Sequence, residues 1–115
     1  MKWYSLKYTN DMDDDQGGYA RAWLVRIRPK YKDDHGLLQH ELFHVSQWWK
    51  TLGLHSLLNL ISKRYRLNSE VGAYKEQLKY EPAIHNPAYY KSMFAGYIST
   101  QYGLNITKEE AEKLL

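Results

Sequence analysis

Two histidines four residues apart, His40 and His44, constrain this chain more than any other feature of its sequence. On an α-helix, residues four apart lie about 40° apart around the axis and about 6 Å apart along it, so two imidazoles can converge on one metal ion. Glu41 follows His40 directly and points to a neighbouring sector, from which its carboxylate can reach a metal-bound water without being a ligand. The spacing H-E-x-x-H therefore predicts a zinc ion bound by the two histidines, with Glu41 as a general base.

The residues around the motif favour a helix over roughly residues 34–52. Apolar side chains recur there at helical spacing. They are Leu37, Leu38, Val45, Trp48 and Leu52. Either Asp33 or Asp34 can cap the start of this helix, and Gly53 offers a C-terminal stop. The alternative is that the two histidines lie on the surface of an amphipathic helix that binds no metal.

Zinc in a hydrolase usually takes three protein ligands and leaves one position for water, so a third ligand is required. In metzincins the third ligand is a His that follows a Gly on the same stretch of chain. Gln47 and Lys50 stand at those two positions here, so that solution fails. The other common solution is a Glu on a later helix. Three glutamates follow at a useful distance: Glu70, Glu76 and Glu81.

Glu70 is the expected third ligand. Gly72 and Ala73 follow it, and such small residues allow a second helix to approach the first closely, as a metal that bridges two helices requires. Glu76 is flanked by lysines and is expected to be solvated. Glu81 precedes a proline and is expected to mark a helix end.

The H-E-x-x-H motif followed by E-x-x-A at residues 70–73 resembles the gluzincin metallopeptidases. Residues 40–47 also resemble the H-E-x-x-H-V-x-Q form of small zincin-like domains from bacteria and phages. The resemblance implies a zinc metallopeptidase, a hydrolase that cleaves peptide bonds through a metal-activated water. The residues that it implies are the Zn²⁺ ligands His40, His44 and Glu70 and the general base Glu41.

Two departures from the gluzincin pattern concern the surroundings of the metal. Tyr74 stands where many gluzincins carry an Asp after the Ala, so a carboxylate that would orient a zinc ligand is missing. No later segment clearly matches the His or Tyr with which larger members contact the substrate. The residue that stabilises the oxyanion therefore stays open among Tyr65, Tyr97, Tyr102 and His85.

The order of predicted elements indicates one α+β domain over residues 1–115. Residues 2–8 and 19–28 are expected to form an N-terminal β-hairpin or small antiparallel sheet, separated by an acidic loop that ends in glycines. A helical zincin-like core with the active-site helix and a Glu-bearing helix follows the sheet. Its segments are a short buried connector at 57–61, the Glu-bearing helix at 68–81, a helix at 87–101 and a last helix begun by a capping box of Thr107 and Glu110.

An extended peptide substrate is expected to add as a strand to the exposed edge of residues 19–28. Alternation along a single strand predicts two faces. One face would carry Tyr19, Arg21, Trp23, Val25 and Ile27, and the other Ala20, Ala22, Leu24 and Arg26.

Composition limits the cellular setting. The chain has no cysteine, which excludes disulfides and thiolate zinc sites, and its net charge of +3 is too small to indicate nucleic-acid binding. The N-terminus lacks the apolar core of a signal peptide, and no run of about 18 apolar residues exists. We therefore expect a cytoplasmic protein that acts on a peptide or protein and has neither nucleic acid nor a membrane as a partner.

Two other functions stay open. A zincin-fold binding or inhibitor protein of phage or mobile-element origin would keep the metal site with weak or no turnover, and the small size of the chain favours it. A nucleic-acid module is the second alternative, since residues 101–110 resemble a helix-turn-helix. However, Glu109, Glu110 and Glu112 would repel phosphate.

Overall fold

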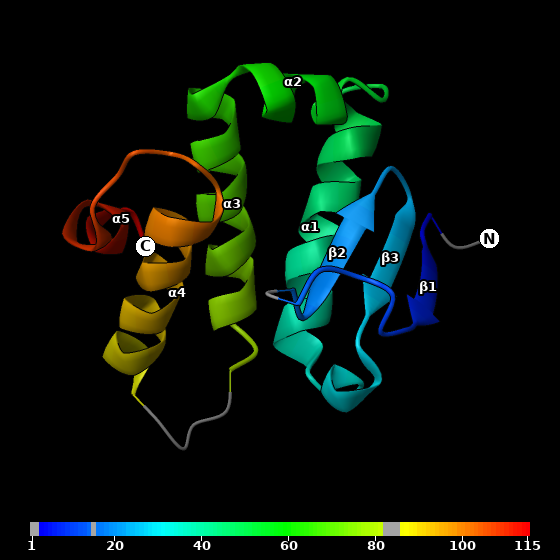
Figure 1. Cartoon of the computed structure of the whole chain (residues 1–115), viewed down its shortest axis with the longest axis horizontal. Coiled ribbons are helices and arrows are strands. Elements are labelled where there is room, and N and C mark those ends of the chain that lie inside the picture. Colours follow the sequence, from blue (N-terminus) through cyan, green and yellow to red (C-terminus); the bar gives the residue numbers. More distant parts are fainter. Residues whose placement is uncertain (1–2, 15, 82–85) are drawn as a thin grey trace.

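The computed structural model describes residues 3–14, 16–81 and 86–115, and it has the expected α+β fold. Figure 1 shows the sheet on one side of α1 and α3 on the other, with α4 and α5 beyond α3. The elements are β1 (Ser5–Tyr8), β2 (Gly18–Arg21), β3 (Leu24–Ile27), the 3₁₀ helix η1 (Pro29–Tyr31), α1 (His35–Lys50), α2 (His55–Ile61), α3 (Lys63–Leu78), α4 (Pro87–Gln101) and α5 (Lys108–Leu114).

The sheet differs from the predicted antiparallel hairpin. Its strand order is β1-β3-β2, in which β1 runs parallel to β3 and β2 runs antiparallel to it. The prediction of one strand over residues 19–28 is wrong, because Ala22 and Trp23 form a two-residue turn that splits it into β2 and β3. Ala22 has a φ of 55°, a conformation that hairpin turns usually assign to Gly or Asn. Ala22-Trp23 is therefore not a dipeptide from which a turn is predicted.

Because of this turn, the residues of β2 do not lie on the faces of the sheet that were predicted relative to β3. Ala20 pairs with Val25 and Gly18 with Ile27, so these four residues share one face, whereas the predicted alternation put Ala20 on the opposite face from Val25. Val25 and Ile27 are fully or almost fully buried against Leu42 and Val45 of α1, and Ala20 packs against this cluster. The first core therefore lies between the sheet and α1.

The helix that carries the H-E-x-x-H motif forms where it was predicted. Asp34, rather than Asp33, is its cap, and its carboxylate accepts a hydrogen bond of 2.9 Å from the backbone N–H of Leu37. After α1 the chain turns through Leu52 and Gly53, both with positive φ. A left-handed residue after a helix is the usual C-terminal stop.

α1 and α3 lie side by side and antiparallel (Figure 1). The contact is closest at Gly72, where an added Cβ would lie 2.5 Å from Cζ of Phe43. At the other end of the pair, a Cβ on Gly36 would lie 3.2 Å from the backbone oxygen of Gln77. Ala73, which follows Gly72 on α3, is fully buried. The prediction that small residues after Glu70 permit close approach is confirmed.

α2 differs from its prediction as a buried connector. It lies across the ends of α1 and α3 at one end of the molecule, and none of its residues is buried (Figure 1). The sequence Leu57-Leu58-Asn59-Leu60-Ile61 looks like core because it is apolar. The helix, however, lies across the ends of α1 and α3 and does not pack between them.

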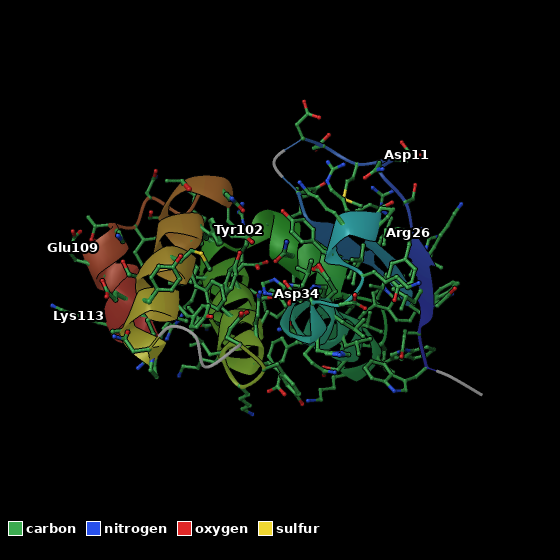
Figure 2. All side chains as sticks on the ribbon, turned by 90° about the horizontal axis from the view of Figure 1, so that it is seen from below. Asp11, Arg26, Asp34, Tyr102, Glu109 and Lys113 are labelled. Carbon is green, nitrogen blue, oxygen red and sulfur yellow. The ribbon has the colours of Figure 1, made fainter. Side chains whose placement is uncertain are left out.

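A second core holds α3, α4 and α5 together around Tyr74, Phe94 and Ile98. Thr107 and Glu110 form the predicted capping box at the start of α5. α5 carries Glu109 and Lys113 at the opposite side of the molecule from the sheet (Figure 2). Within residues 3–14, 16–81 and 86–115, no helix is long and apolar enough to cross a membrane.

The α1–α3 contact predicts opposite outcomes for two glycine substitutions. Gly72→Ala places a methyl group against Phe43, whereas a Cβ on Gly96 of α4 meets nothing within 4 Å. Both variants gain the same helix propensity, so the clash sets the difference. We expect Gly72→Ala to be less stable than Gly96→Ala by about 1–3 kcal/mol in urea unfolding. Equal stabilities would show that Phe43 moves aside without cost.

Candidate metal centre

Three side chains from two helices converge on one point. His40 and His44 lie on successive turns of α1, and Glu70 lies opposite them on α3. Nε2 of His44 lies 3.3 Å from Oε1 of Glu70, and Nε2 of His40 lies 3.4 Å from the same oxygen. One ligand atom from each residue lies within 4.8 Å of the others, and the side chains are at most 11% exposed. The sequence-predicted ligands are thus brought together.

Gln47 and Ser69 fix the orientation of the His44 ring. Oε1 of Gln47 lies 3.0 Å from Nδ1 of His44 and accepts a hydrogen bond of 2.8 Å from the Ser69 hydroxyl. An amide oxygen only accepts, so Nδ1 of His44 carries a proton. In the neutral ring, Nε2 then presents its lone pair toward Glu70. A hydrogen bond of this kind on the far nitrogen is typical of metal-binding histidines.

His40 is held differently. Its Nδ1 is buried and has no hydrogen-bond partner among the described residues. Its ring packs edge-on against Tyr74 at a centroid distance of 4.3 Å. Tyr74 thus occupies the place where the gluzincin resemblance would put an orienting carboxylate, and it holds His40 by ring packing rather than by a hydrogen bond.

Glu70 and His44 stabilise each other's charged forms. Burial by itself lowers the pKa of His44, but the charge and hydrogen bond of Glu70 outweigh it and raise that pKa to about 9. Burial by itself raises the pKa of Glu70, but His44 and His40 outweigh it and hold that pKa well below its usual range. The centre is therefore built around a buried carboxylate that needs a positive partner.

Glu41 faces the same site without joining the ligand group. It is only 4% exposed, and burial raises the pKa of its carboxyl, with His40 and His44 opposing this shift and Glu70 adding to it. A carboxylate with a raised pKa takes up a proton more readily than an exposed one.

The centre lies in the wall of a cavity of about 680 Å³. Residues of all three packed layers line it. Residues 17–20 come from the edge strand β2 and the residue before it, and α1 and α3 supply the ligands. Tyr97 and Gln101 come from α4. The cavity is large enough to admit a segment of peptide.

The candidates for stabilising an oxyanion fall into different places. Tyr97 and Tyr102 line the cavity, and the hydroxyl of Tyr102 lies 2.7 Å from that of Tyr74. Tyr65 is not part of the lining, although its hydroxyl lies 2.7 Å from Nδ1 of His55. His85 lies outside the described residues.

His55 is a cavity residue that the sequence motifs did not single out. It begins α2, its ring lies 5.7 Å from that of His44, and it lines the cavity. Burial, with the charge of His44, lowers its pKa to about 4, so the ring is neutral at pH 7. His55 reaches the cavity because α2 crosses the ends of α1 and α3. No local sequence pattern predicts that crossing.

Comparison of the chain with known protein families, with curated proteins and with solved structures gave no match.

The coupling of Glu70 to His44 predicts a pH dependence in the metal-free protein. A histidine whose pKa is raised from 6.5 to about 9 stabilises the fold fully below pH 6.5 and loses this contribution as the pH rises through 9. We expect the free energy of unfolding, measured in urea with a chelator, to fall by roughly 1–3 kcal/mol from pH 6.5 to 9. Glu70→Gln should remove this slope.

Glu76→Gln is the matched control, because Glu76 lies on the same helix but pairs with exposed Lys79. It should keep the slope of the wild type. A slope that survives Glu70→Gln would assign the alkaline loss of stability to another group.

Proposed function

We propose that the protein is a gluzincin-like zinc peptidase, with Zn²⁺ held by His40, His44 and Glu70 and with Glu41 as the general base. The observation that carries the proposal is the convergence of these four side chains in one cavity. Two imidazoles and one carboxylate are a common donor set of catalytic zinc, which keeps a further position open.

The spacing of the donors suits a metal better than direct hydrogen bonds. The distances of 3.3 and 3.4 Å from the histidine nitrogens to Glu70 exceed the 2.7–3.2 Å of good N–H···O bonds. Ring orientation by Gln47 also leaves Nε2 of His44 as the ligand atom. The residues present therefore fit zinc, although His40 lacks a comparable hydrogen bond.

Bound zinc would lower the pKa of a coordinated water to near 7 and polarise a substrate carbonyl. The residues of the chain perform the proton transfers. Glu41 takes the proton of the attacking water and gives it to the leaving amine as the peptide bond breaks. His55, Tyr97 and Tyr102 line the cavity and are the donors available to the oxyanion.

β2 offers the substrate a place to bind. It is an edge strand, and residues 18–20 are among those that line the cavity beside the centre. An extended peptide can add to such an edge through backbone hydrogen bonds, which leaves its side chains to set specificity. The expected binding edge covered residues 19–28. Because β3 is the central strand, only the part that forms β2 can accept a further strand.

Metal content tests the ligand set. We expect one zinc per chain in the wild type after expression with zinc, and strong loss in His40→Ala, His44→Ala and Glu70→Ala, measured by elemental analysis. Glu76→Ala is the control, since Glu76 lies on α3 and pairs with Lys79 outside the centre. Zinc retained by Glu70→Ala but lost by Glu76→Ala would overturn the third ligand, and a zinc-free wild type would overturn the site.

Glu41→Gln separates an enzyme from a metal-binding protein without turnover. Gln keeps the size of the side chain but cannot take up a proton at neutral pH. We expect near-normal zinc content and a loss of about 10²–10⁴ in the rate of cleavage of a peptide library. Unchanged cleavage would place the base elsewhere. No cleavage by either protein would favour the binding or inhibitor function.

A further inference from the structure

Five large aliphatic side chains are exposed where α1, α2 and α3 meet. Leu60 and Ile61 of α2 are 74% and 68% exposed, and Leu52 in the turn before α2 is 92% exposed. Leu57, Leu60 and Ile61 are spaced three and four residues apart, so they share one face of α2. The five residues are Leu52, Leu54, Leu57, Leu60 and Ile61, and we call this surface the basic-apolar corner.

Three cations lie on the helix ends that flank α2. Lys50 ends α1, and Lys63 and Arg64 begin α3, and all three are exposed. The chain has no Asp or Glu from residue 42 to residue 69. The acids that bound this stretch, Glu41 and Glu70, are buried in the candidate metal centre. The corner therefore combines five exposed apolar side chains with three exposed cations, on a stretch of chain that carries no acidic residue of its own.

We propose that the basic-apolar corner binds the surface of an anionic phospholipid bilayer. Aliphatic side chains enter the boundary between headgroups and acyl chains, and lysines and arginines beside them pair with anionic headgroups.

A second copy of the chain fits this surface less well than lipid. A two-fold contact would place the corner against itself, so the cations of one copy would face those of the other. α2 lies at one end of the molecule (Figure 1), and its Leu57, Leu60 and Ile61 side chains are each more than half exposed there. Exposed side chains of this kind enter a lipid layer readily.

The sequence expectation of no membrane partner came from the lack of a spanning segment, which does not bear on surface binding. His55 and Asn59 of the same helix line the cavity. Docking through α2 would therefore hold the candidate metal centre close to the bilayer. Lipid binding does not depend on the proposed peptidase, because none of the corner residues belongs to the centre.

The test is flotation of the purified chain with two kinds of vesicle: phosphatidylcholine alone, and phosphatidylcholine with phosphatidylglycerol in equal parts. We expect binding to the anionic vesicles only, weakened by added salt. Each cation near a bilayer contributes about fivefold in binding, so neutralising three should weaken it about a hundredfold. That variant combines Lys50→Gln, Lys63→Gln and Arg64→Gln.

Two further variants complete the design. The apolar variant combines Leu57→Gln, Leu60→Gln and Ile61→Gln, which keeps helix formers of similar length, and it should lose binding. The matched charge control combines Lys75→Gln, Lys108→Gln and Lys113→Gln. These lysines are exposed and lie further along α3 and on α5. The control should bind like the wild type, and thermal melting should show that all three variants fold.

Several results would overturn the proposal. One is a wild type that binds neither vesicle. Another is equal weakening by the control and the corner charge variant, which would indicate net charge instead of a site. A third is a wild type that is dimeric without lipid and becomes monomeric in the apolar variant, which would assign the corner to a second copy. None of these results bears on zinc content or on peptide cleavage.

Discussion

The close contact of α1 with α3 is the constraint on which the rest of the structure depends. A metal bridging two helices needs donor atoms within a few ångströms, and helices separated by large side chains cannot supply them. Gly72 lies where a side chain would collide with Phe43, and Gly36 serves the same purpose at the other end of the pair. These glycines give up helix propensity so that Glu70 can face the two histidines of α1.

The close packing of α1 against α3 also determines the chemistry of the centre. Once the helices are in contact, Glu70 is buried and cannot be satisfied by water, so its charge must be met by a cation or by protonated histidine. Nearby, Gln47 and Ser69 orient His44, and ring packing against Tyr74 holds His40. His40 and His44 themselves stabilise the carboxylate through Nε2, so a metal ion would take the place of their protons beside Glu70.

Three other elements, β2, α4 and α2, border the site from different sides. The sheet covers α1 and brings the edge strand β2 to the cavity, and α4 closes the opposite wall. α2 adds His55 from above and turns its apolar face outward. One short helix thus contributes to the cavity and to the basic-apolar corner, because a helix that crosses the ends of two others has an inner and an outer face.

The sequence by itself determined the local features. The spacing of His40 and His44, the small residues after Glu70 and the capping box before α5 each act within a few residues, so each was predictable. Tertiary structure decided the rest. The parallel pairing of β1 with β3, the turn at Ala22 and the exposure of α2 all depend on contacts between distant segments. His55 reaches the centre only through that packing, and spacing along the chain carries no record of it.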